Sequence, residues 1–469
     1  MSCSAPSSDA TSSNAAAIAP EADPPATEAQ REGESWKGGR IGPALVKTLR
    51  HFFPNFVPWL ASTPDPRDPR FITYPIACVL MSGILLFLTK LGSRWQMRFH
   101  FRTASFIANM NFLLGTSMED MLHPDTLAYL AKRLPLSALE ELRGAMVFQL
   151  LRRKVFEKDR LLGRYYLVAI DGTGVLVYRQ RHCKRCLTQS RDGTVLYYHP
   201  VLEAKLVTPS GFSISIATEF IENPAEGAEK QDCEQKAFVR LAERLKRDFP
   251  QLRLCLLLDG LYASRPVFDR CALNDWRYIV TFKEGSAPAV FDEYERLKAS
   301  GAKEHRATRR EVPQQYWWVN GIDFGGTPVN VLECREPTSQ GRSVRFVWLS
   351  DIPIDEANFA ELGNGGGRLR WKIENEGFNI QKTNGYELEH AYSEHEHAAK
   401  NFYLLLQIAH LIAQLLEKGL LARSMRKHIG AIRNVARFLL EELRYVTWEP
   451  GQLESMLAQR IQIRFNDSS

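Results

Sequence analysis

Two aspartates, Asp171 and Asp259, each end a run of apolar residues and precede a glycine, in the segments VAIDGTG and LLLDG. Such runs indicate buried β strands, which would deliver both carboxylates to the edge of a sheet. Two like charges held close together are unfavourable unless a cation compensates them, and Mg²⁺ is a natural compensation. Asp-Gly is also a favoured turn dipeptide, so either residue could simply mark the end of its strand.

Glu374 is the third candidate acid, and it lies four residues after Arg370 in the segment LRWKIENEGFNIQ, which predicts a helix. This spacing places the two side chains on one helix face. An ordinary surface ion pair would produce the same spacing. Glu376 is a rival acid, but it would lie about 200° further round the helix and face away from Glu374.

The elements around these acids alternate between strands and helices. Residues 161–284 predict three strands, a helix, a buried strand, a second helix and a further strand, and the first three strands should form an antiparallel meander. Residues 285–350 predict a β-rich insertion, and residues 351–415 contain the helix of the glutamate. The predicted fold class is therefore α/β, with a mixed sheet flanked by helices.

The remaining segments predict helices and a tail. Residues 43–160 have apolar residues at helical spacing and predict a helical N-terminal domain, and residues 416–469 predict a C-terminal helical region. Residues 1–42 are poor in apolar residues and predict a disordered tail without a targeting signal. Residues 71–91 are long enough to span a membrane, but polar side chains and Pro75 interrupt them, so we expect a buried core helix there.

The composition is that of a globular protein. Of 469 residues, 45% are hydrophobic and 24% are charged, which excludes a wholly disordered or fibrous chain. The net charge of +6 is too small to establish nucleic-acid binding without knowing how the charges are distributed. Eight cysteines are too few for a disulfide scaffold and indicate a reducing, cytosolic compartment.

The three acidic blocks, VAIDGTG, LLLDGLYA and RLRWKIENEGFNIQKTNGYELEH, resemble those of bacterial insertion-sequence transposases of the DDE type. More narrowly, they resemble the subgroup with a Tyr-x2-Arg-x3-Glu-x6-Lys signature and a β-rich insertion before the glutamate. The likeness extends from about Asp65 through residue 415. It implies an RNase H-like catalytic fold in which Asp171, Asp259 and Glu374 are the catalytic, metal-binding triad.

The resemblance also implies an activity and partners. The chain would be a DNA transposase that uses two Mg²⁺ ions, with Mn²⁺ as a possible substitute. It would bind transposon-end and target DNA as a homodimer in a synaptic complex, with no membrane, in the bacterial cytoplasm at the nucleoid. Water would first free a 3′-OH at the transposon end, and this hydroxyl would then attack target DNA. Two alternatives stay open, namely an RNase H-like DNA nuclease without strand transfer and a catalytically inactive DNA-binding relative.

The sequence departs from the signature at two positions. Gly367 stands where the tyrosine is expected, and Gln381 stands at the lysine position, with Lys382 one residue later. On a regular helix, the residue seven after Glu374 lies about 20° from it and the next lies about 80° away. Lys382 could therefore replace the signature lysine only if the helix is irregular or if DNA approaches from that side. The resemblance assigns Lys382 and Arg370 to DNA binding, and the planar fork of Arg370 suits a phosphate.

An aromatic residue of the insertion is a further candidate for DNA binding. In the resembled subgroup, such a residue can hold a flipped base at the transposon end, and here this suggests Trp318. Core packing is the ordinary role of an aromatic residue on a strand.

The loop after the first predicted strand contains two features, each of which has two interpretations. The pattern His182-Cys183-x2-Cys186 suits zinc if His199 or Cys233 completes the site, and reduced free thiols are the alternative. The same loop carries basic residues that either contact phosphate or face solvent, and these are Arg179, Arg181, Lys184, Arg185 and Arg191. A second basic group with the same ambiguity consists of Arg423, Arg426, Lys427, Arg433 and Arg437.

Overall fold

The structure is a computed structural model that describes residues 41–191, 193–224, 230–338, 340–419, 432–449, 451 and 454. All of these residues belong to one unit, Arg40–Ser469. The predicted tail lies outside the described residues except for Ile41 and Gly42, which begin the first described helix.

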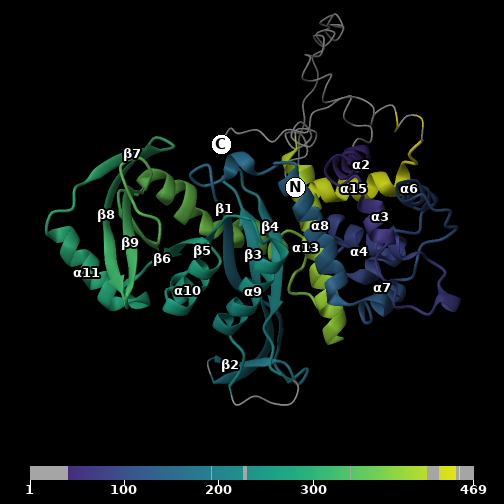
Figure 1. The fold of residues 1–469 in the computed structure, drawn as a ribbon. Helices are drawn as coiled ribbons and strands as arrows, with labels where there is room; N and C mark the ends of the chain where they lie inside the picture. The colour runs from purple at the N-terminus through teal and green to yellow at the C-terminus, as the bar shows by residue number, and fades with distance from the viewer. Residues whose placement is uncertain are drawn as a thin grey trace, which may run out of the picture. The chain divides into compact units, whose positions relative to one another are not determined.

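Helices alone make up the described chain before the sheet (Figure 1). They are α2 Ile41–Phe52, α3 Phe56–Ala61, α4 Ile76–Leu88, α5 Met97–His100, α6 Ala104–Leu114, α7 Pro124–Ala131 and α8 Leu136–Arg152. Helix α4 is the core helix predicted within residues 71–91, and all of its residues are buried. None of the helices in the described part of the chain is long and apolar enough to cross a membrane.

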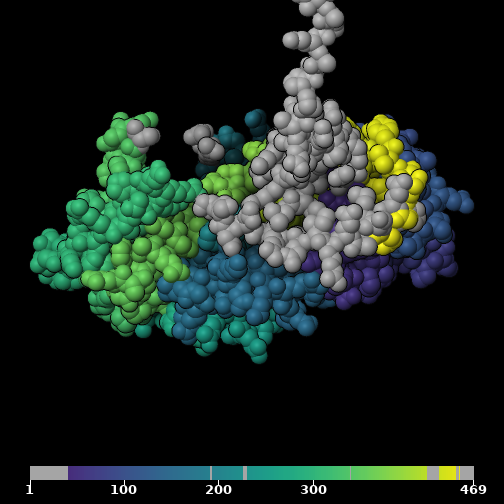
Figure 2. All heavy atoms as spheres, turned by 90° about the horizontal axis from the view of Figure 1, so that it is seen from above, coloured from purple at the N-terminus to yellow at the C-terminus, as the bar shows by residue number. Residues whose placement is uncertain are grey.

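Ten strands form one mixed sheet in the order β2-β3-β1-β5-β6-β10-β9-β8-β7, and β4 also pairs with β3. The strands are β1 Tyr166–Tyr178, β2 Leu187–Arg191, β3 Thr194–Val207, β4 Ser213–Phe220, β5 Leu254–Leu258, β6 Arg277–Thr281, β7 His305–Arg309, β8 Val312–Phe324, β9 Thr327–Pro337 and β10 Ser343–Ser350. Strands β7–β9 (green) lie on the other side of β1, β3 and β4 from helices α2–α7 (purple and blue) (Figure 1). In the space-filling view, the green and purple residues likewise lie at opposite ends (Figure 2).

The central strands follow the predicted order. β1, β3 and β4 form the expected antiparallel meander, and β5 and β6 run parallel to β1. Helix α9, Glu234–Asp248, connects β4 to β5, and helix α10, Arg265–Leu273, connects β5 to β6. Every residue of β5 is buried, as expected for a strand covered on both faces. The prediction of a mixed α/β sheet flanked by helices is confirmed.

The prediction that Asp171 ends the first strand was wrong. β1 continues to Tyr178 and stays paired with β3, with a register shift between Gly174 and Leu176. An Asp-Gly pair is typical of turns, but cross-strand pairing to β3 holds Gly172 in an extended ladder here. β1 and β3 therefore extend beyond the central sheet as a hairpin arm, and β2 pairs with the outer part of β3.

The three strands predicted between residues 285 and 350 are present as β8, β9 and β10. They form an antiparallel set that joins the central sheet through the pairing of β10 with β6. Two elements of this segment were not predicted, helix α11, Pro288–Ala299, and strand β7. The sequence of β7, HRATR, contains no apolar run that would have indicated a strand.

The predicted glutamate helix is present but irregular. It consists of a π-helical turn at Glu361–Gly366, a 3₁₀ turn at Gly367–Trp371, a second π-helical turn at Ile373–Phe378, and helix α12 at Asn379–Thr383. Two long helices follow, α13 Glu396–Lys418 and α15 Ile432–Tyr445. The remaining short 3₁₀ turns are Pro69–Phe71, Arg94–Gln96, Glu157–Asp159, Gly260–Tyr262 and Glu284–Ser286.

A buried polar network joins the N-terminal helices to the sheet. The Arg143 guanidinium of α8 donates to the Ser215 hydroxyl at 2.9 Å and to the Thr218 hydroxyl at 2.5 Å, both on β4. These hydroxyls in turn donate to the Glu203 carboxylate of β3. Because all four side chains are buried, the hydrogen bonds compensate the desolvation of both charged groups.

Candidate active site

The strand register places the two aspartates side by side. β1 and β5 run parallel with Ala169 opposite Leu257, and continuing that register by two residues brings Asp171 opposite Asp259. Asp259 keeps an extended backbone, with φ −87° and ψ 176°, although it lies just past the end of β5. Since neighbouring strands are about 4.8 Å apart, the two carboxylates leave the sheet from adjacent positions.

Asp171 accepts from a backbone and a side-chain donor, and Asp259 accepts from a backbone donor. One oxygen of Asp171, Oδ1, accepts the Gly172 N–H at 3.0 Å, and the other, Oδ2, lies 3.2 Å from Nη1 of Arg370. Oδ1 of Asp259 accepts the Leu261 N–H at 2.9 Å and so begins the short 3₁₀ turn that follows β5. These contacts fix where both carboxylates point.

Both other predicted acids act electrostatically on Asp171. Burial is the largest effect on its pKa, the Arg370 guanidinium opposes it, and the charges of Asp259 and Glu374 add to it, so that the pKa of Asp171 is raised to about 6. Glu374 acts on this aspartate from the second π-helical turn. The structure therefore brings Asp171, Asp259, Glu374 and Arg370 into one cluster.

Glu234 is a fourth acid in this cluster, and the sequence analysis missed it. It is the first residue of α9, and its carboxylate occupies the space beside Gly172 that a Cβ there would fill. Its Oε2 accepts the Tyr262 hydroxyl at 3.3 Å. Burial and the charge of Asp171 raise the pKa of Glu234. An acid in the first turn of a helix is common for dipole reasons alone, so the sequence offers no distinct signal for this position.

The donor set of this cluster consists of carboxylate oxygens, which suits Mg²⁺ or Mn²⁺. In the described residues, however, the four acids do not bring three donor atoms within 4.8 Å of one another. A shared ion would therefore require the carboxylates to move closer, and it would compete with Arg370 for Asp171. The four acids are therefore suitable ligands for a divalent ion. In this structure, however, their carboxylates lie too far apart to share one, and the Arg370 guanidinium compensates the charge of Asp171 instead.

Arg370 is buried between Asp171 and an aromatic ring. The residue is 6% exposed, and its guanidinium carbon lies 4.5 Å from the centre of the Trp371 ring. Its buried Nε has no hydrogen-bond partner within the described structure. A buried donor without an acceptor is costly, so the hydrogen-bonding capacity of Arg370 is not fully used by Asp171.

The irregular helix changes the spacing of the side chains that follow Glu374. A π-helical turn contains one more residue than an α-helical one, and such a turn begins directly before Glu374. The residue that returns to the Glu374 side is thereby delayed by one position, from Gln381 to Lys382. Gln381 is fully buried and hydrogen-bonds to Gln407 and His410 of α13, both at 2.9 Å.

Lys382 itself is half-buried and pairs with Glu389, with 2.9 Å between Nζ and Oε1. The irregularity that its DNA-binding role requires is therefore present in the structure. The role itself stays a prediction.

Packing against Trp348 explains why position 367 is a glycine. A Cβ at Gly367 would lie 2.5 Å from Cδ1 of the buried Trp348 indole on β10. Any side chain at this position would collide with that ring, so Trp348 occupies the space that a residue at position 367 would need. A glycine here lets the helix of Glu374 pack directly on β10.

Trp318 belongs to a cluster of three rings. Its ring centre lies 4.1 Å from that of His305 and 5.4 Å from that of Phe359, and the rings are nearly parallel in both pairs. The indole is half-buried. Its proposed contact with a base stays a prediction, and a stacked base would have to use the part of the ring that this cluster leaves open.

The basic residues of the β1–β2 loop are partly neutralised. Arg185 pairs with Glu222 at 3.4 Å and with Glu396 at 3.2 Å, and Arg181 lies over the Tyr197 ring. In the second basic group, Arg437 lies 3.6 Å from Glu441. Arg423, Arg426 and Lys427 fall outside the described residues.

Comparison with known proteins gives no family to which the chain could be assigned. The chain matches none of the protein-family models and none of the curated proteins with which it was compared.

Proposed function

We propose that this chain is a DNA transposase of the DDE type, which cleaves transposon ends and transfers the resulting 3′-OH to target DNA. The observation that carries the proposal is the register of β1 and β5, which aligns Asp171 with Asp259 within the electrostatic reach of Glu374. Like charges repel, so a fold that brings together acids from distant parts of the chain needs a compensating interaction, which metal ions would supply.

The arrangement of elements supports an RNase H-like core for this proposal. A three-stranded antiparallel meander is followed by two strands parallel to β1, with helices as the connections. The glutamate arrives from a helix that follows a set of strands, in the order that the resemblance implies.

The residues of the cluster would share the work of phosphoryl transfer. Divalent ions held by Asp171, Asp259 and Glu374 would activate the attacking oxygen and stabilise the leaving oxygen. Before DNA binds, Arg370 compensates the charge of Asp171. With DNA bound, the free Nε donor of Arg370 would bind a phosphate oxygen, and the buried setting would strengthen that contact.

The test is cleavage and joining with labelled duplexes taken from the DNA that flanks the gene. We expect the full-length protein with Mg²⁺ to nick these ends and to join a pre-cut 3′-OH end to a target plasmid. Asp171→Asn, Asp259→Asn and Glu374→Gln should each lower both rates at least about 100-fold, because each removes a charge from the metal-binding set.

Glu376→Gln is the matched control, because Glu376 lies on the same helical segment but pairs with Lys372 at 2.8 Å. We expect this variant to keep most of the activity. Cleavage without joining would favour the nuclease without strand transfer. Cleavage that survives Asp171→Asn unchanged, or binding of the ends without any cleavage, would overturn the proposal.

A further inference from the structure

A second group of metal-binding side chains lies outside the acidic cluster, where the loop between β1 and β2 meets β3. Sγ of Cys183 lies 3.4 Å from Sγ of Cys186, and the two sulfurs lie 3.3 Å and 3.2 Å from Nε2 of His199. Both cysteines are free thiols. In the described part of the chain, no other set of three such side chains has its donor atoms this close together.

We propose that Cys183, Cys186 and His199 bind one Zn²⁺ ion that fastens the β1–β2 loop to β3. A tetrahedral zinc site has Zn–S bonds of about 2.3 Å and Zn–N bonds of about 2.0–2.1 Å, which separates two sulfurs by about 3.8 Å and a sulfur from a nitrogen by about 3.6 Å. The observed triangle has sides of 3.4, 3.3 and 3.2 Å. Small side-chain rotations would open it to the size of a zinc site.

The chemistry of the three ligands selects zinc over the ions that suit the acidic cluster. Thiolate and imidazole ligands favour Zn²⁺, whereas carboxylates favour Mg²⁺ and Mn²⁺. The spacing of Cys183 and Cys186, with two residues between them, is that of many zinc-binding loops. The cluster is also sheltered, because Cys186 is fully buried and His199 is half-buried.

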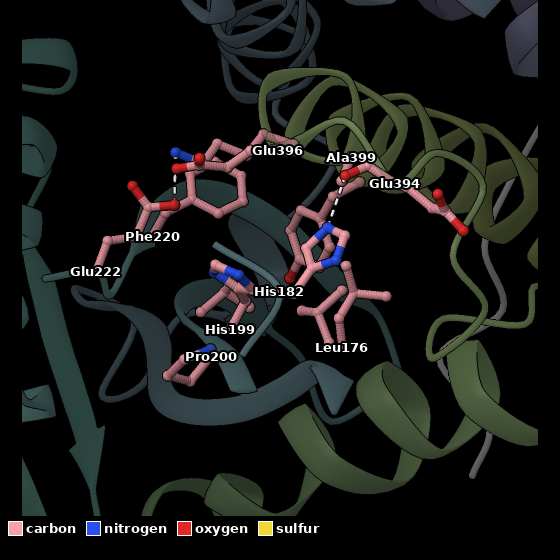
Figure 3. A pocket seen from close by; sticks show the side chains of 13 residues that line it. Leu176, His182, His199, Pro200, Phe220, Glu222, Glu394, Glu396 and Ala399 are labelled. Atoms are coloured by element: carbon pink, nitrogen blue, oxygen red, sulfur yellow. Dashed lines mark hydrogen bonds and ion pairs between the residues drawn. The ribbon is translucent and has the colours of Figure 1, made fainter. Parts of the chain in front are cut away.

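The structure removes two other ligand candidates that the sequence suggested. Nε2 of His182 lies 2.7 Å from the Glu394 carbonyl oxygen, and the ring stacks on Tyr178 with 4.4 Å between centres. His182 therefore bridges to the segment before α13 (Figure 3). Cys233 is exposed and does not belong to the cluster.

Two carboxylates line the same pocket as His199, but both already have cationic partners (Figure 3). Glu222 lies 2.6 Å from Lys400, and Glu396 lies 3.2 Å from Arg185. We therefore assign three protein ligands to the zinc ion, with a water molecule as the fourth ligand of the tetrahedron, and place neither glutamate among them.

The zinc ion would give the basic loop a fixed position. The loop between Tyr178 and Leu187 makes no strand pairing with β3. The metal would connect Cys183 and Cys186 of this loop to His199 of β3. Structural zinc sites commonly supply order of this kind to short segments. The proposal does not depend on the transposase assignment, because metal content is measured without DNA.

The test is the zinc content of the full-length protein after dialysis against a weak chelator, measured by mass spectrometry of the elements. We expect one zinc ion per chain. Cys183→Ser, Cys186→Ser and His199→Gln should each weaken zinc binding at least about 100-fold. Cys233→Ser is the matched control and should keep its zinc, as should Asp171→Asn in the acidic cluster.

A second measurement on the unmodified protein covers the case in which the variants fail to fold. Zinc should protect the half-buried Cys183 from alkylation but leave the exposed Cys233 reactive, and removal of the metal should make Cys183 reactive as well. Replacement by Co²⁺ should produce the thiolate-to-cobalt absorption of a tetrahedral site. Zinc well below one per chain, zinc that survives the ligand substitutions in folded protein, or a Cys183–Cys186 disulfide in freshly purified protein would overturn the proposal.

Discussion

At the scale of single residues, burial and a neighbouring cation have opposite effects on the charged form of Asp171. Asp171 is mostly buried next to two other predicted acids, and Arg370 is the one cation that the structure brings into direct contact with it. Burial raises the pKa of Asp171 to about 6 in spite of this cation. A site that is unfavourable without further positive charge is suited to binding metal ions, because the ions relieve the repulsion.

This balance predicts how Asp171→Asn changes stability. The folded-state pKa of about 6 exceeds the ordinary value of 3.8, so ionisation of Asp171 disfavours the folded state. The penalty is absent below about pH 4, grows between about pH 4 and pH 6, and is complete above that range. At pH 8 without metal, the variant should have a free energy of unfolding up to about 3 kcal/mol higher than that of the unmodified protein.

Urea denaturation at several pH values in the presence of a chelator measures this difference. Asp292→Asn on the exposed surface of α11 is the control and should show no comparable dependence on pH. A variant Asp171→Asn that is no more stable at pH 8 than at pH 4, relative to the unmodified protein, would show that the carboxylate is not destabilised by its setting.

Apolar runs indicated the strands that deliver Asp171 and Asp259, and helical spacing placed Arg370 on the face of Glu374. The resemblance, and not these patterns, grouped Glu374 with the two aspartates. The sequence could not identify Glu234, because a glutamate at the start of a helix looks the same whether or not it faces a site. The sequence also could not predict that Gly367 packs against Trp348, 19 positions earlier, because this contact depends on how the helix packs on β10.

At the scale of elements, the helix that carries Glu374 is the decisive one. Sequence spacing predicted its existence and its end near Asn384, and both are confirmed. Regular helical geometry could not predict the two π-helical turns. The first packs closely on β6 and β10, and the second lies against β3 and β4. The second turn changes which side chain follows Glu374 on the same side.

The irregular helix predicts that restoring the signature lysine will fail. Gln381→Lys would bury an ammonium group among Gln407 and His410, and we expect it to lower the free energy of unfolding by about 2–4 kcal/mol without raising activity. Lys382→Ala should leave stability nearly unchanged but weaken the binding of end DNA by about 10-fold. Chemical denaturation and a DNA-binding titration measure the two effects. Higher activity in Gln381→Lys would contradict the proposed phase of the helix.

At the scale of the whole molecule, the described helices and the sheet are joined through buried polar contacts. The sequence predicted helices before the sheet and the order of the central strands, because each depends on local patterns. It did not reveal that Arg143 reaches Glu203 through two hydroxyls, because these residues lie far apart in the chain. Nor could it show that β7–β10 extend the central sheet through β6.

This network predicts a large effect of a single substitution. Arg143→Met leaves the Glu203 carboxylate buried without its positive partner, and it should lower the free energy of unfolding by about 3 kcal/mol. Arg152→Met is the matched control on the same helix, where the side chain is exposed, and it should change stability by less than about 0.5 kcal/mol. Thermal and urea denaturation test both. Equal effects of the two substitutions would mean that the network does not join α8 to the sheet.

The most direct test of the central claim is a crystal structure of the protein with Mn²⁺ and end DNA, measured for anomalous scattering at the manganese edge. We expect anomalous peaks between the carboxylates of Asp171, Asp259 and Glu374, with Arg370 turned from Asp171 to a phosphate. Manganese bound elsewhere, with these three carboxylates apart and Arg370 still paired to Asp171, would contradict it.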